Sequence, residues 1–159
     1  MSAAAFSAAF DLERMITDST SLVRQETLRA CAAIAELPSY SQRWVETAVL
    51  PVLCARKQVR DYHQRAVLLS GVGELAALMG PSSLEDALLP MALSMAQDPV
   101  PNLRLILAST LQRVAPQLTV QVLSGSVIPA LEALERDEDM DVLGAAREAL
   151  EVCMARVHG

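Results

Sequence analysis

The side chains of this 159-residue chain that could support catalysis or bind a metal are few and widely separated. Its two histidines, His63 and His158, lie 95 residues apart (158 − 63), and no His-Glu dipeptide occurs. A catalytic or metal site needs two or three such groups that converge. We therefore expect no metal, no cofactor, no catalytic residue and no small-molecule substrate, and we predict that the chain is not an enzyme.

The three cysteines, Cys31, Cys54 and Cys153, are odd in number and form no CxxC pair. This spacing indicates neither a zinc site nor a disulfide framework. We expect the three thiols to be small apolar core residues. Free thiols fit a reducing, intracellular setting, so we expect a cytoplasmic protein, with the nucleus as an additional compartment.

Two glycine-containing segments resemble parts of catalytic or phosphate-binding loops. They are Ser70-Gly71-Val72-Gly73 and Ser124-Gly125-Ser126. Neither completes the GxxxxGK[ST] pattern of a phosphate loop or the GxSxG pattern of a nucleophile elbow. We interpret these small residues as positions where helices approach closely.

Two charged segments remain as candidate contact sites. The basic one contains Arg56, Lys57, Arg60 and Arg65, and the acidic one runs over residues 132–141. Each is either a solvated turn whose charges suit the adjacent helix ends, or a contact for a partner of opposite charge. The acidic segment has a third interpretation, which is to solubilise the exposed end of a stack of repeats.

The composition favours helices and argues against nucleic acid and membrane as partners. Hydrophobic residues make up 52% of the chain but aromatic residues only 3%, and alanine and leucine are abundant. These two residues are the strongest helix formers. Residues 81–159 hold five basic and eleven acidic side chains, whereas nucleic-acid binding needs a basic stripe. The longest uncharged run, residues 114–131, contains two prolines and is too polar for a membrane helix.

The elements that must position these side chains follow from a repeated dipeptide. Leu50-Pro51, Leu89-Pro90 and Ile128-Pro129 are spaced at 39 residues (90 − 51 and 129 − 90). Fourteen residues after these prolines come Arg65, Arg104 and Leu143, and one repeat earlier Phe10 and Arg24 occupy the same two positions. A fixed period of this length indicates stacked supersecondary units. We predict an all-α, right-handed α-solenoid of four antiparallel helix pairs.

The second helix of each pair also repeats its apolar positions. At 13, 21 and 24 residues after the register position, eleven of twelve residues are apolar. These spacings place the three residues on one helical face. The twelve residues are Val23, Cys31, Ile34, Gln64, Val72, Leu75, Leu103, Leu111, Val114, Val142, Leu150 and Cys153.

We call the two helices of each pair A and B, and the connection between them the A–B turn. The predicted A helices cover 3–16, 41–56, 83–96 and 119–136, and the B helices 21–36, 61–78, 102–115 and 141–157. The repeats span 3–38, 41–80, 82–116 and 119–157 within one domain of residues 1–159. Breaks are expected at Pro38-Ser39, Gly80-Pro81 and Pro116-Gln117, because each stops a helix. The prolines inside the A helices should kink them.

These features together resemble the HEAT repeat: helix pairs, a proline in helix A, an aspartate in the turn and an arginine at the start of helix B. The segment LLPMALSMAQDPVPNLRLILASTLQRVAPQL, with VIPALEALERDEDMDV and AREAL after it, strongly resembles the scaffold (A) subunit of type 2A serine/threonine protein phosphatase. Trp44, Tyr62 and Arg65 also match that family. The resemblance covers about residues 10–155 and corresponds to the last four repeats of that scaffold.

In that family the A–B turns line up along one ridge, and the C-terminal turns hold the phosphatase catalytic subunit. The resemblance therefore implies a non-enzymatic scaffold whose partner is such a catalytic subunit. The alternative is a generic helical-repeat adaptor, for transport or assembly, with an unrelated protein partner. The partner-binding residues implied by the matching turns are Arg56, Lys57, Arg60, His63, Asp98, Pro99, Val100, Asn102, Glu138, Met140 and Asp141.

The chain departs from the family in the aspartate–arginine ladder of HEAT repeats. Asp18 with Arg24 and Asp98 with Arg104 keep both members of the ladder. Val59 replaces the aspartate of the second repeat, and Leu143 replaces the arginine of the fourth. We expect these gaps to disturb stacking between repeats. The family tryptophan, Trp44, is expected to pack against a neighbouring helix instead of touching the partner.

Overall fold

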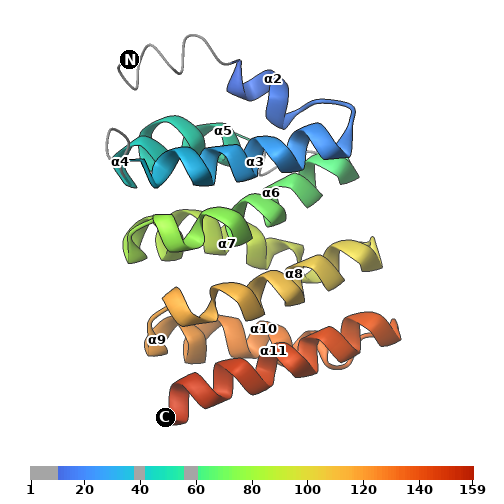
Figure 1. Ribbon diagram of the computed structural model, residues 1–159. Helices are drawn as coiled ribbons and strands as arrows, with labels where there is room; N and C mark the ends of the chain where they lie inside the picture. Colours follow the sequence, from blue (N-terminus) through green and yellow to red (C-terminus); the bar gives the residue numbers. More distant parts are fainter. Residues whose placement is uncertain (1–10, 38–41, 56–60) are drawn as a thin grey trace. The chain divides into compact units, whose positions relative to one another are not determined.

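The structure, a computed structural model, describes residues 11–37, 42–55 and 61–159 (Figure 1). Those residues form helices joined by short turns, and no β-strand occurs among them. The chain divides into two compact units, residues 1–80 and 81–159. Their boundary is the predicted Gly80-Pro81 break. The all-α prediction is confirmed, while the right-handed winding and the single domain stay predictions.

The first unit contains two A–B pairs. Helix α3 packs against both α2 and α6. Its core is built from side chains no more than 1% exposed, such as Ile16, Leu28, Leu53 and Leu68. The elements, in order, are α2 (Leu12–Ile16), α3 (Ser21–Ala35), α4 (Gln42–Trp44), η1 (Val45–Val49), α5 (Leu50–Cys54), α6 (Tyr62–Leu75) and η2 (Ala76–Leu78).

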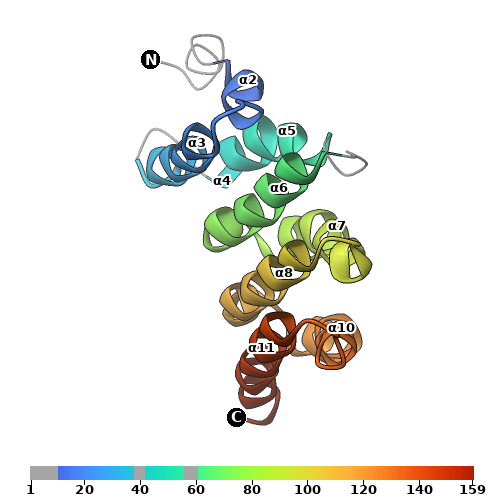
Figure 2. The same ribbon diagram turned by 90° about the vertical axis from the view of Figure 1, so that its right-hand side faces the viewer.

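The second unit contains the third and fourth pairs. Its B helices, α8 and α11, lie side by side, and the A-helix segments α7 and α10 lie to their right in Figure 2. The two layers enclose Leu88, Leu103, Leu111 and Leu131, which are all fully buried. The elements are η3 (Ser83–Leu88), α7 (Leu89–Leu93), η4 (Ser94–Gln97), α8 (Pro101–Val114), η5 (Ala115–Gln117), α9 (Val120–Val122), η6 (Leu123–Val127), α10 (Ile128–Leu134) and α11 (Met140–His158).

The prolines that mark the repeat each follow a π-helical turn. The turns η1, η3 and η6 end one residue before the Leu-Pro or Ile-Pro dipeptide. The N–H of Leu50, Leu89 and Ile128 donates to a carbonyl five residues back, instead of the usual four. A proline has no N–H to donate, and a π-turn absorbs the resulting gap in the helical ladder. The predicted disturbance of helix A thus takes the same form in three repeats.

The helix bounds agree with the predicted ones to within two residues at the described ends, with one exception. The first A helix was predicted to run unbroken over 3–16, but α2 begins at Leu12, because Asp11 caps it by accepting the N–H of Arg14. In the third pair the A helix ends where predicted, because Pro99 and Pro101 cannot continue it. The B helix α8 then begins at Pro101. Pro116 likewise lies in the short 3₁₀ turn η5, which closes the third repeat. The predicted Pro38-Ser39 break lies outside the described residues.

The shared apolar positions of the B helices face the core. Eight of the twelve residues are buried, and Val23, Ile34, Gln64 and Leu150 are half-buried. Trp44 is 5% exposed, which confirms that it packs inside the protein. The register read from the sequence therefore identifies the buried face of every pair.

One of the glycine segments does mark a close helix approach. A Cβ atom added to Gly71 in α6 would lie 3.0 Å from Leu53 Cδ1 and 3.1 Å from Cδ2. Glycine at this position lets α6 pack directly on the side chain of Leu53. Among the described residues, no helix combines the length and apolar character that a membrane span requires.

Candidate protein-binding turns

The A–B turn of the third repeat is built around Asp98. Its carboxylate accepts a hydrogen bond from the backbone N–H of Val100 at 3.0 Å, and its carbonyl accepts one from Arg104 Nη1 at 2.6 Å. Asp98 is 8% exposed, whereas Pro99 and Asn102 are exposed. The Asp98 side chain thus gives the N–H of Val100 a hydrogen-bond acceptor where the helix is interrupted. The turn therefore has a fixed shape and an outward-facing rim.

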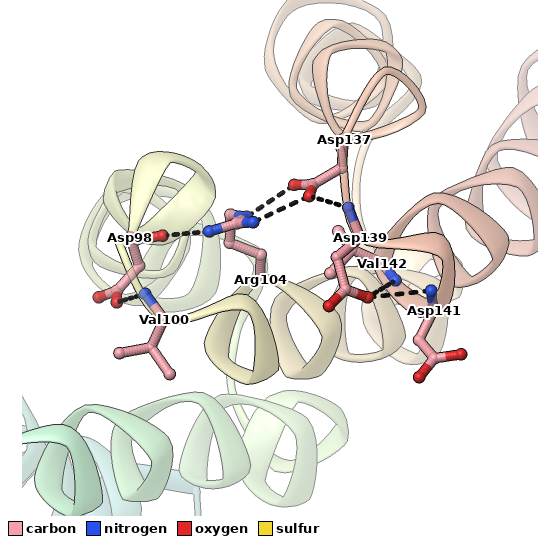
Figure 3. Close-up of polar contacts among 7 residues, drawn as sticks. All are labelled: Asp98, Val100, Arg104, Asp137, Asp139, Asp141 and Val142. Carbon is pink, nitrogen blue, oxygen red and sulfur yellow. Dashed lines mark hydrogen bonds and ion pairs between the residues drawn. The ribbon is translucent and has the colours of Figure 1, made fainter.

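Arg104 joins the third turn to the fourth (Figure 3). Its Nε lies 2.6 Å from Asp137 Oδ2, and its Nη2 lies 2.8 Å from Asp137 Oδ1. The two side chains are only 16% and 8% exposed. The hydrogen bond with Asp137 raises the pKa of Arg104, and the same bond lowers the pKa of Asp137 below its usual value. A bidentate pair of this kind fixes geometry as well as charge.

The A–B turn of the fourth repeat is fastened at two points. Asp137 accepts the N–H of Asp139 at 2.9 Å, and Asp139 caps helix α11 by accepting the N–H groups of Asp141 and Val142. Met140, between them, is 72% exposed. Because its backbone starts α11 under this cap, the methionine projects from a rigid turn. Its neighbours Glu138 and Asp141 are also exposed.

The arginine ladder differs from the predicted one. We expected Asp98 to pair with Arg104 within one repeat, but Arg104 reaches only the Asp98 carbonyl. Its charged partner is Asp137 of the following repeat. The leucine at position 143 therefore does not break the rung between the third and fourth repeats, contrary to our expectation. In this rung, the arginine of the third repeat joins the aspartate of the fourth.

The first A–B turn repeats the geometry of the third in its backbone contacts. Asp18 accepts the N–H of Thr20 at 2.8 Å, and Arg24 Nη1 donates to the carbonyls of Asp18 and Ser19. Arg24 is 6% exposed, and its Nε has no hydrogen-bond partner. Here too the expected pairing with the Asp18 carboxylate is absent, since Arg24 bonds the carbonyl instead.

The second A–B turn is described only at its end. Arg56, Lys57 and Arg60 lie outside the described residues. Asp61 caps α6 by accepting the N–H of His63 at 2.8 Å. The ring of the exposed His63 lies edge-on to the ring of Tyr62, with 5.0 Å between the ring centroids.

The structure thus divides the predicted partner-binding residues by exposure. Asp98 supports its turn from inside, and Val100 is half-buried. The exposed members, which can touch a partner, are His63, Pro99, Asn102, Glu138, Met140 and Asp141. In the second unit they come from the two turns that Arg104 ties together. Whether these residues bind a partner stays a prediction.

The side chains that could bind a metal lie dispersed over the described segments. In the described part of the chain, no three His, Cys, Asp or Glu residues gather as a metal site would require. Cys31 and Cys153 are buried as expected, whereas Cys54 is half-buried, and none of the three forms a disulfide. Burial raises the pKa of Cys31 to about 11. A thiol with that pKa stays protonated near neutral pH and is a poor nucleophile.

Asp137 is the supporting residue that sequence reasoning did not single out. It stands eight residues after Pro129, as Asp98 stands eight residues after Pro90. The repeat register therefore marks Asp137 as the equivalent of Asp98. The other acidic residues of segment 132–141 made this one position hard to distinguish. Asp139, two residues later, is the N-cap of α11.

Part of the chain is similar in sequence to curated phosphatase subunits. Over 53 residues it is 45% identical to the beta isoform of the human 65 kDa regulatory subunit of serine/threonine-protein phosphatase 2A. Over 56 residues it is 41% identical to the PP2A 65 kDa regulatory subunit of Drosophila melanogaster. These matches cover 33% and 35% of this chain, and only 9% and 10% of the relatives. No model of a known protein family matches the chain.

A solved structure shares the fold over a larger part of the chain. The crystal structure of Cex1p matches 92% of this chain and 28% of that one, with a TM-score of 0.70 and 16% sequence identity. At that identity the likeness concerns the fold alone. The chain is an all-α helical-repeat protein, and part of its sequence resembles 65 kDa regulatory subunits of phosphatase 2A.

Proposed function

We propose that this chain is a non-enzymatic scaffold that binds the catalytic subunit of a type 2A-like serine/threonine protein phosphatase through its A–B turns. The partial sequence similarity to 65 kDa regulatory subunits supports the class of partner. The chain spans about a tenth of those relatives, so the proposal concerns only the contacts that these four repeats can make.

The observation that carries the proposal is the 72% exposed Met140 on the fourth turn. Asp137 and Asp139 hold the backbone on both sides of it, and Arg104 holds Asp137. An apolar side chain on a preorganised turn loses little conformational entropy when it enters a partner's pocket. Exposed Glu138 and Asp141 surround it with negative charge, which suits a basic rim on the partner.

The central experiment measures binding of a phosphatase catalytic subunit by calorimetry. Met140→Ser should weaken binding about tenfold or more, because buried anchors carry much of an interface's free energy. The matched control is Met154→Ser, since Met154 is 41% exposed but lies near the far end of α11 from the turn. Equal affinities for wild type and Met140→Ser would contradict a contact at the fourth turn.

A second pair of variants tests the charged part of the surface. Arg56→Glu with Lys57→Glu should slow association, and the effect should shrink as salt rises, because rim charges act mainly on the association rate. Arg113→Glu, near the end of α8, should leave binding nearly unchanged. If the wild-type chain fails to bind any phosphatase catalytic subunit, the generic adaptor with an unrelated protein partner replaces this proposal.

A further inference from the structure

The guanidinium of Arg104 contacts the third and fourth A–B turns through different nitrogen atoms (Figure 3). Its Nη1 donates to the backbone carbonyl of Asp98 in the third turn at 2.6 Å. Its Nε and Nη2 donate to the two carboxylate oxygens of Asp137 in the fourth turn, at 2.6 Å and 2.8 Å. The guanidinium is planar and rigid, so these bonds set how far apart the two turns lie.

Both groups that the guanidinium holds lie next to exposed contact candidates. In the third turn, exposed Pro99 directly follows Asp98. In the fourth turn, Asp137 accepts the N–H of Asp139 at 2.9 Å, and the next residue, Met140, is 72% exposed. The relative placement of the two exposed rims therefore depends on one side chain that is itself only 16% exposed.

A shared restraint of this kind affects binding as well as folding. Surface turns are usually more mobile than the helices they join. A partner that binds a mobile turn must order it, and this ordering reduces the free energy of binding. When one rigid group holds two turns, a partner that touches both meets contacts whose spacing is already set. Contacts on the two turns then support one another, so their effects on affinity are not additive.

From these contacts we propose that Arg104 is a positioning residue, which makes the third and fourth turns a single binding surface for one partner. The partner touches exposed side chains of both turns, whereas Arg104 acts from beneath them. The identity of the partner rests on the proposed function, while the coupling of the turns rests on the contacts of Arg104 alone. Lysine keeps the charge but has no planar fork, so it cannot make all of these bonds in the same geometry.

Arg104→Lys tests the coupling first in the free chain. Backbone ¹⁵N relaxation reports the mobility of the Val100 and Asp139 amides, one in each turn. We expect their order parameters to fall together, from about 0.85 for a rigid backbone towards about 0.6. The matched control is Arg147→Lys, because Arg147 is 61% exposed and pairs with Glu135 through Nε at 3.0 Å. This control should leave both amides as rigid as in the wild type.

Binding of a phosphatase catalytic subunit, measured by calorimetry, gives the second readout. Arg104→Lys should weaken binding about tenfold in the otherwise unchanged chain, but less than about threefold in the Met140→Ser chain, because the lost restraint acts through that side chain. A substitution that merely lowered the stability of the fold would weaken binding by the same factor in both chains. Arg147→Lys should leave the affinity unchanged.

The two proposals fail in different measurements. A wild-type chain that binds no phosphatase catalytic subunit contradicts the proposed partner, and the order parameters still decide the role of Arg104. Asp137→Asn is the second variant, since it removes the charge but keeps the shape, and it should loosen both turns in the same way. The positioning role is overturned if these variants leave either turn rigid, or if Arg104→Lys weakens binding equally with and without Met140.

Discussion

Arg104 and Asp137 are 33 residues apart in the sequence, yet they share a two-point ion pair, with contacts of 2.6 Å and 2.8 Å. The pair joins the A–B turns of two successive repeats. Arg104 also holds the carbonyl of Asp98, and Asp137 also holds the N–H of Asp139. One guanidinium therefore fixes both turns that carry the exposed candidate contacts of the second unit.

Removing the carboxylate of this pair should destabilise the protein. We expect Asp137→Ala to lower the free energy of unfolding by about 3 kcal/mol, because it leaves the largely buried Arg104 without its charged partner. Urea denaturation measures the change. The matched control is Glu135→Ala, which breaks an ion pair with Arg147 whose side chains are 38% and 61% exposed. That change should cost no more than about 1 kcal/mol, and a similar loss in both variants would contradict the special role of Asp137.

The same carboxylate should contribute to the pH dependence of stability. The pKa of Asp137 in the folded protein is lowered by its hydrogen bond with Arg104, below the value of about 3.9 usual for an unfolded chain. Its contribution is then complete above about pH 4 and is lost as the pH falls towards the folded pKa. Asp137→Asn should be less stable at neutral pH but lose less stability on acidification. Denaturation at a series of pH values measures both slopes, and identical slopes would refute the assignment.

The repeated apolar register predicts where a cavity is most costly. Leu111 is fully buried at the shared position 21 residues after Pro90, and its replacement by alanine should cost about 2–5 kcal/mol. Gln121→Ala, on the exposed side of α9, should change stability by no more than about 0.5 kcal/mol. Equal shifts of the urea midpoint for the two variants would show that the register does not mark the core.

Two helical glycines should respond differently to the same substitution. A Cβ on Gly144 in α11 would meet no atom within 4 Å, so Gly144→Ala should stabilise the protein by up to about 1 kcal/mol through helix propensity. At Gly71 the added methyl would press on Leu53, so the same change should bring little or no gain. Thermal unfolding of both variants compares them directly. A larger gain at Gly71 than at Gly144 would show that α6 does not need a small residue there.

The sequence alone determined the helices and their buried faces. The spacing of Pro51, Pro90 and Pro129 set the register, and from it the buried positions of Leu103 and Leu111 followed. Turn residues were equally readable, because proline and aspartate stop one helix and cap the next by local chemistry. Exposure of Met140 and burial of Trp44 agree with the same pattern. These features depend on neighbours in sequence or on a fixed period.

What only the tertiary structure decided depends on distance across repeats. Arg104 bonds both the carbonyl of Asp98 and the carboxylate of Asp137, and the packing of the two turns decides that its charged partner comes from the next repeat. The π-turns before the prolines are another example, since a missing N–H predicts a disturbance but not the shift to a carbonyl five residues back. A periodic sequence defines which residues face inward, whereas packing between repeats decides which polar groups meet.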